Sequence, residues 1–213
     1  MKKIKNNYLY SKRLKFLKYA KPYISEKGLT NDIFKKISNL NGLDVKEIEI
    51  LFPEGNSDLI QFALYQLANE LENYCKKIDL IRLPIHKRIR IILLSKINLM
   101  NKEKIFYKKI FLNLFIPQKN FSLTSQIYNS VDQMWFIAGD LSVDFNFYTK
   151  RLILSGIYLR IILFFFNNDN QKGLEDLLDE NLKRVSKIPE IKSKFNIFKE
   201  YFPKFINIVR NSN

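Results

Sequence analysis

The chain contains few of the residues that end helices or form turns. Its 213 residues include only six glycines and six prolines, too few for an all-β sandwich or a many-stranded α/β sheet. Long helices with short connections are therefore favoured, and we expect an all-α fold. Because 46% of the residues are hydrophobic, the chain can build a core, which excludes intrinsic disorder for most of it.

A single cysteine and a single histidine exclude several kinds of chemistry. Cys75 has no partner for an internal disulfide, and its apolar helical surroundings indicate a small core residue. His86 alone cannot form a His-rich zinc site or a di-iron centre, which needs a Glu-x-x-His motif on each of two helices. No nucleophile, base and orienting group are spaced as a catalytic set. We therefore expect a protein that is not an enzyme and that holds no metal and no cofactor.

The sequence also shows no segment with the composition of a membrane span or a targeting peptide. The longest apolar run, residues 152–166, is interrupted by Arg160 and is shorter than the roughly 20 residues that span a bilayer. The Lys- and Asn-rich amino terminus lacks the apolar run of a signal peptide and the Arg/Ser composition of a transit peptide. We expect a cytoplasmic, bacterial protein without a transmembrane helix.

What is abundant is positive charge, with 36 Lys and Arg against 21 Asp and Glu, a net charge of +15. Such an excess indicates an anionic partner: nucleic acid, an acidic lipid surface or an acidic protein. The abundance of Lys, Asn and Ile is also typical of an AT-rich genome, so the charge alone does not choose among these partners. Both ends of the chain are basic. The first 25 residues carry eight basic groups and no acidic one, and residues 183–213 carry eight basic groups against Glu190 and Glu200.

The spacing of apolar residues and the positions of helix-ending residues predict an all-α fold of about nine helices. Pro22 is expected to end the first helix, and Asp44 to cap the third. The expected helices cover residues 8–19, 30–40, 44–51, 57–78, 84–100, 102–115, 121–138, 140–166, 174–187 and 190–210.

The two short helices between residues 30 and 52 have the order of a helix-turn-helix, which leaves a TetR-like DNA-binding transcription regulator as an alternative function. A reading helix needs donors on the face that enters the DNA groove. This helix instead carries Asp44, Glu47 and Glu49, whose carboxylates would face phosphates. Nucleic acid is therefore disfavoured as a partner.

The most informative segment is residues 131–151. Gly139 can adopt the left-handed conformation that stops one helix, and Asp140 can cap the next. Asp144, Tyr148 and Arg151 follow at i, i+4 and i+7, where their side chains share one helical stripe. The stripe can be part of a functional surface, or an intrahelical salt bridge that only orients a helix pair.

A longer motif surrounds this stripe. It consists of Asp132, Trp135, Ala138-Gly139-Asp140, Ser142, Asp144-Phe145-Asn146, Phe147, Tyr148-Thr149-Lys150-Arg151 and Tyr158. In this motif the chain resembles the TetR-like accessory lipid-binding protein of ubiquinone (coenzyme Q) biosynthesis, the ninth member of the eukaryotic Q-synthesis set, with its alphaproteobacterial relatives. The resemblance runs from about residue 14 to 185 and is strong over about thirty residues. Phe147 stands where the family usually has Trp, and Leu141 and Val143 stand where it usually has Thr.

The resemblance implies a homodimeric accessory protein, not an enzyme, that sequesters a polyprenyl quinone intermediate, or a phospholipid, in an apolar cavity. It implies presentation of the quinone to the di-iron demethoxyubiquinone hydroxylase. The residues expected to bind that partner are Asp144, Phe147, Tyr148, Lys150, Arg151 and Leu154, of which Phe147, Lys150 and Leu154 are expected to form an exposed strip. The residues expected to bind lipid are Leu152, Ser155, Gly156, Leu159 and Leu163. Ser155 and Gly156 can leave room for an isoprenoid tail or allow close helix packing.

The last predicted helix has the pattern of a membrane-surface helix. Phe195, Phe198, Phe202 and Ile206 lie on one apolar stripe, with lysines largely off it. The same stripe can instead pack on the core of the protein. We expect two parts, a lipid-binding helical domain over residues 1–188 and a membrane-associating helix over residues 189–213. We expect peripheral association with the bacterial inner membrane.

Overall fold

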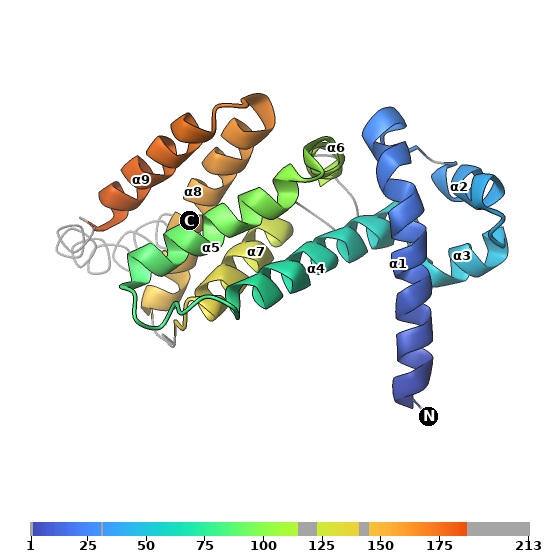
Figure 1. The fold of residues 1–213 in the computed structure, drawn as a ribbon, viewed down its shortest axis with the longest axis horizontal. Coiled ribbons are helices and arrows are strands. Elements are labelled where there is room, and N and C mark those ends of the chain that lie inside the picture. The colour runs from blue at the N-terminus through green and yellow to red at the C-terminus, as the bar shows by residue number, and fades with distance from the viewer. Residues whose placement is uncertain (1, 31, 115–122, 141–144, 187–213) are drawn as a thin grey trace, which may run out of the picture. The chain divides into compact units, whose positions relative to one another are not determined.

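The structure, a computed structural model, describes residues 2–30, 32–114, 123–140 and 145–186. These residues form nine α-helices and no strand, so the all-α prediction is confirmed (Figure 1). The helices are α1 (Lys2–Lys27), α2 (Ile33–Asn41), α3 (Val45–Leu51), α4 (Asn56–Cys75), α5 (Ile85–Asn101), α6 (Lys104–Leu114), α7 (Leu123–Ile137), α8 (Phe145–Asn167) and α9 (Gln171–Ser186).

The chain divides into two compact units, Met1–Asp169 and Asn170–Asn213. Helices α1 to α8 belong to the first unit, and α9 belongs to the second. The predicted domain boundary at residue 188 lies outside the described residues and stays a prediction.

Helix α1 continues through Pro22, so the prediction that this proline ends the helix is wrong. Pro22 lies on the exposed side of the helix, where water can hydrogen-bond the carbonyl group that loses its partner. The hydroxyl of Ser25 donates to the carbonyl oxygen of Lys21 at 2.9 Å, which adds a bond near the break. The helix ends at Gly28, which has a φ of 81° and donates its N–H to the carbonyl of Ile24.

Helices α1 to α3 pack around a cluster of aromatic rings. Phe16 stacks on Phe34 with ring centres 5.4 Å apart, and both rings contact Phe52, which contacts Phe62 of α4. The guanidinium of Arg13 lies 4.8 Å from the ring centres of Phe52 and Phe62. This cluster fixes the amino-terminal helices on the start of α4.

The short helix α3 occupies the place of a DNA-reading helix. Asp44 caps it, as predicted, by accepting the backbone N–H of Lys46 at 3.0 Å. Glu47 forms an ion pair with Lys12 of α1. Acidic side chains therefore remain at this position, and Lys46 is the one basic side chain of α3.

The remaining helices of the first unit form the larger core. Helix α4 packs on α5 and α7, α7 packs on α8, and α1 packs on α6. Figure 1 shows α4, α5 and α7 running side by side, with α8 beyond α7. Fully buried side chains from these helices meet between them, among them Leu67, Leu71, Ile92, Ile97, Val131, Met134 and Ile161.

Candidate functional site

The candidate site is the corner where α7 ends and α8 begins. Gly139 has a φ of 80°, which confirms the predicted left-handed stop. The N–H of Asp140 bonds to the carbonyl of Trp135 and the N–H of Gly139 to that of Phe136, each at 3.0 Å. These two bonds form a Schellman motif, which satisfies carbonyls that the helix end would leave unpaired.

Residues 141–144 lie outside the described residues, so the start of α8 at Asp140 stays a prediction. Helix α8 is described from Phe145 onward, and two basic side chains of its second turn lie beside the Asp140 carboxylate. Lys150 donates to one oxygen at 2.7 Å, and Arg151 approaches the other at 3.5 Å. Because the side chain of Asp140 is only 5% exposed, these cations compensate a carboxylate that burial would otherwise destabilise.

Arg151 is the centre of this corner. Its buried guanidinium donates from Nε to Asp132 of α7 at 2.6 Å and from Nη1 to the carbonyl of Phe147 at 3.2 Å. The guanidinium carbon also lies 3.2 Å from the centre of the Phe147 ring. Arg151 therefore joins the start of α8 to α7 through charge, hydrogen bonds and an aromatic face.

The structure describes only two residues of the predicted stripe of Asp144, Tyr148 and Arg151. Asp144 lies outside the described residues. Tyr148 is 66% exposed, and Arg151 takes its carboxylate partners from α7 and the turn after it. The reason is that Arg151 lies on the face of α8 that packs on α7, whereas Tyr148 lies beside that face. The structure thus shows a cross-helix ion pair at Arg151, which the sequence pattern did not predict.

The inner stripe of α8, defined as Arg151, Leu154, Tyr158, Ile161 and Phe165, is buried. Leu154 is only 2% exposed, so the prediction of an exposed strip is wrong at that residue. The seven-residue spacing from Phe147 to Leu154 continues to Ile161 and therefore follows the face that packs on α7. Lys150 is half-buried, and its ammonium lies 5.5 Å from the centre of the Trp135 ring.

The outer stripe of α8, defined as Tyr148, Leu152, Gly156, Leu159 and Leu163, is largely exposed. Leu152 is 74% exposed and Leu163 is 45% exposed. A side chain added at Gly156 would meet no atom within 4 Å, so close helix packing does not require this glycine. Ser155, next to the stripe, donates to the carbonyl of Arg151 at 2.8 Å. The lipid-binding role predicted for Leu152, Ser155, Gly156, Leu159 and Leu163 stays a prediction.

A small apolar cavity lies beside this stripe. Its volume is about 60 Å³, and its wall includes Leu159, Ile162 and Leu163 of α8 with Phe111 and Leu112 of α6. This is about twice the roughly 30 Å³ that one water molecule occupies in the liquid. This cavity is too small to hold a polyprenyl tail.

Arg88 is a site residue that the sequence analysis missed. Its guanidinium donates to the carbonyl oxygens of Ile81 and Leu83 at 2.7 Å each, and to that of Ala138 at 2.8 Å. It thereby links the loop before α5 to the end of α7, where the helix dipole favours a cation. A Cβ at Gly139 would lie 3.3 Å from Nη1 of Arg88. The only sequence signal was an arginine in the first turn of the helix that Pro84 opens.

Lys96 of α5 is a second missed residue. It is 3% exposed, and its ammonium lies 5.3 Å from the ring centre of the fully buried Tyr158. Among the described residues it forms no ion pair, and burial lowers its pKa to about 7. Burial also raises the pKa of the Tyr158 hydroxyl. The signal in the sequence was a lysine on the apolar face of α5, between Leu93 and Met100.

The predicted membrane residues Phe195, Phe198, Phe202 and Ile206 lie outside the described residues. In the ranges that the structure covers, no helix is both long enough and apolar enough to cross a bilayer.

The segment that contains the corner matches a known protein family. Residues 122–189 match the COQ9 family model. This range contains α7, the corner, α8 and α9, and the match confirms the resemblance drawn from the motif.

Three relatives named "Ubiquinone biosynthesis protein COQ9, mitochondrial" match a shorter stretch. The rat protein (Rattus norvegicus) is 49% identical over 45 residues, which are 21% of this chain and 14% of that protein. The bovine protein (Bos taurus) is 40% identical over 52 residues, 24% of this chain and 16% of that protein. The human protein (Homo sapiens) is 47% identical over 45 residues, with the same coverage as the rat protein. The matches thus span about a seventh of each relative's length.

Proposed function

We propose that this chain acts in ubiquinone biosynthesis as a membrane-associated lipid-binding accessory protein, not as an enzyme. It sequesters a polyprenyl quinone intermediate and presents it to the di-iron demethoxyubiquinone hydroxylase. The proposal is supported by the COQ9 match over residues 122–189 and by the names of the relatives that match there.

The observation that carries the lipid-binding part is the exposed outer stripe of α8. It lies within the matched range and presents Leu152 and Leu163 to solvent. Covering one leucine side chain contributes roughly 1.5–3 kcal/mol. A polyprenyl tail that lies along the stripe would thus gain several kcal/mol from these contacts.

Native mass spectrometry of protein purified from a quinone-producing host tests this role. The wild-type chain should carry a polyprenyl quinone. A double variant, Leu152→Ser with Leu163→Ser, should carry severalfold less. Ile81→Ser is the matched control, because Ile81 is 82% exposed and lies outside the matched range. Equal quinone loading in the wild-type protein and the double variant would contradict a ligand on the outer stripe.

We further propose that the hydroxylase contacts the start of α8, through Tyr148 and Lys150. Tyr148 is 66% exposed and its ring lies 5.1 Å from that of Phe147. An exposed aromatic anchor of this kind typically contributes about 2 kcal/mol at an interface, so Tyr148→Ala should weaken hydroxylase binding about thirtyfold. Tyr65→Ala on α4 is the control, since Tyr65 is 55% exposed. If both variants bound the hydroxylase equally well, the contact would lie elsewhere.

A further inference from the structure

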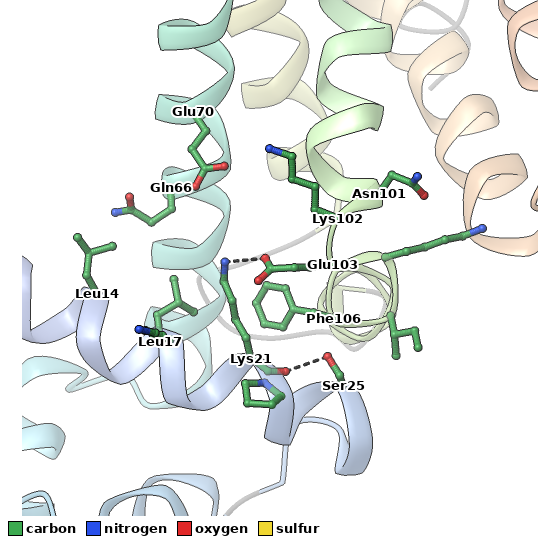
Figure 2. Close-up of a pocket in the computed structure, with 14 residues that line it drawn as sticks. Leu14, Leu17, Lys21, Ser25, Gln66, Glu70, Asn101, Lys102, Glu103 and Phe106 are labelled. Carbon is green, nitrogen blue, oxygen red and sulfur yellow. Dashed lines mark hydrogen bonds and ion pairs between the residues drawn. The ribbon is translucent and has the colours of Figure 1, made fainter. Parts of the chain in front are cut away.

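Helix α1 borders a cleft and a groove, and two of its basic residues differ there in whether they have a partner. In the cleft between α1, α4 and the junction of α5 with α6, Lys21 forms an ion pair with Glu103 at 2.6 Å (Figure 2). The groove between α1, α3 and α4 contains Arg13, and we call it the Arg13 groove. Its volume is about 560 Å³, within the range of about 300–1,000 Å³ that is typical of ligand sites. Its lining includes Leu9, Tyr10, Arg13, Ile50, Phe62 and Tyr65.

Aromatic rings, and not carboxylates, hold Arg13 in this groove. Its guanidinium carbon lies 4.8 Å from the ring centres of both Phe52 and Phe62. Its Nε is buried and has no hydrogen-bond partner within the part of the chain that the structure describes. Stacking on aromatic rings fixes the plane of a guanidinium and leaves its terminal N–H groups available for a carboxylate. Arg13 is therefore a positioned cation without a counter-ion among the described residues.

The charges of the groove favour a monoanion. Arg13 and Asp58 are the charged residues of the lining, and these two described side chains form no ion pair with each other. The Asp58 carboxylate accepts the backbone N–H of Glu54 at 2.8 Å. A dianion such as a phosphate monoester would meet one cation and the repulsion of Asp58. A single carboxylate matches the one arginine, because the two groups form parallel charge-assisted hydrogen bonds.

The surface beside Arg13 is aromatic and apolar. The Tyr10 ring packs edge-on against Phe62, with ring centres 5.8 Å apart, so Tyr10 lies next to the ring on which Arg13 stacks. The Tyr10 hydroxyl donates to the side-chain oxygen of Gln66 at 2.9 Å, which fixes this ring. Ile50 is 77% exposed. An aromatic ring in the ligand would cover this surface and pack on the rings that line it.

We propose that the Arg13 groove binds a small aromatic monocarboxylate. The carboxylate accepts hydrogen bonds from the terminal nitrogens of Arg13, and the ring of the ligand lies against Tyr10 and Phe62. The groove lies outside residues 122–189, the range that matches the COQ9 family. The inference goes beyond the proposed function and does not rest on it.

Ligand-observed NMR titration of the full chain tests the role of Arg13. The probes are 3-phenylpropionate and its neutral analogue 3-phenylpropionamide. The acid should bind about tenfold more tightly than the amide, which is the effect of a hydrogen bond between charged groups. Arg13→Gln should abolish this preference by weakening the acid about tenfold without weakening the amide, whereas a loosened groove would weaken both probes. Lys15→Gln is the control, because Lys15 is exposed on α1 and does not line the groove.

A second pair of variants tests the apolar wall. Ile50→Ser should weaken the acid and the amide by the same factor, severalfold, because both probes carry the same ring. Leu40→Ser is the matched control, since Leu40 is 76% exposed, close to the 77% of Ile50, and does not line the groove. If Ile50→Ser and Leu40→Ser bind both probes equally well, the ring does not lie in this groove and the proposal is wrong.

Other outcomes also overturn the proposal. It is wrong if 3-phenylpropionate does not bind saturably, if the acid and the amide bind equally, or if Arg13→Gln behaves like Lys15→Gln. Tighter binding of phenyl phosphate would assign the groove to phosphate esters, and tighter binding of the peptide acetyl-Phe-Glu-Phe-amide would assign it to a protein segment. Equal melting temperatures establish that the variants fold. If Arg13→Gln does not fold, Arg13→Lys provides the test, because a lysine keeps the charge but loses the planar fork and should reduce the preference for the acid severalfold.

Discussion

Replacing Lys96 by methionine should stabilise the protein, although most substitutions of buried residues destabilise. Lys96 is 3% exposed, and burial lowers its pKa from 10.5 to about 7. In the unfolded chain the ammonium regains its ordinary pKa, so the unfolded state binds the proton more tightly than the folded state. Integrating between these two pKa values gives a penalty of about 4 kcal/mol at pH 7. Methionine has a similar length and carries no charge, so Lys96→Met should recover most of this energy.

The pH dependence gives a second signature of the same group. Because the folded pKa of this base is depressed, the stability penalty is complete below pH 7 and disappears as the pH rises toward 10.5. The wild-type protein should therefore gain about 2 kcal/mol of unfolding free energy between pH 7 and pH 9. Lys96→Met should lose this gain. Above pH 9 the buried groups Cys75, Tyr107 and Tyr158, whose pKa values burial raises, oppose the trend.

Urea unfolding followed by circular dichroism at pH 7 and pH 9 measures both effects. Lys15→Met is the matched control, because Lys15 lies on the exposed surface of α1. If Lys96→Met were less stable than the wild type at pH 7, or if wild-type stability were equal at both pH values, the Lys96 ammonium would have a compensating partner and the reasoning would be refuted.

Three further substitutions test the corner and the first helix by thermal or urea unfolding. Arg151→Met should lower stability by about 3 kcal/mol, since it leaves the buried Asp140 carboxylate without one of its cations; an unchanged midpoint would show that the pair is dispensable. Gly139→Ala should cost about 1–2 kcal/mol because of its φ of 80°, and a neutral effect would mean that the turn rearranges. Pro22→Ala should raise stability by about 2 kcal/mol by restoring an N–H donor within α1, whereas a loss would show that the proline is favourable there.

Much of the fold could be predicted because it depends on local features. The helix that Pro84 opens was expected over residues 84–100 and runs over Ile85–Asn101. The Asp44 cap and the Gly139 stop depend on single residues and their immediate neighbours, and both are confirmed. The end predicted at Pro22 is wrong, because a proline on the exposed side of a packed helix can be tolerated.

The candidate site was harder to predict because its contacts join separate helices. Periodicity identifies the face of a helix but not the residue that faces it from another helix. The i+7 rule therefore placed Leu154 with Phe147 but gave no indication that α7 buries that face. The partners of Arg151 are Asp132 and Asp140, and both belong to the motif, yet their pairing depends on how the corner folds. The contacts of Arg88 and Lys96 depend on tertiary packing in the same way.

The most direct test of the proposed function is transfer of a polyprenyl quinone from a membrane to the protein. Liposomes that contain the quinone are mixed with the purified chain and removed by centrifugation, and the quinone in the supernatant is quantified. The account predicts that the wild-type chain extracts quinone up to about one molecule per chain, and that Leu152→Ser with Leu163→Ser extracts severalfold less. If a folded wild-type chain left all the quinone in the liposomes, the lipid-binding account would be contradicted.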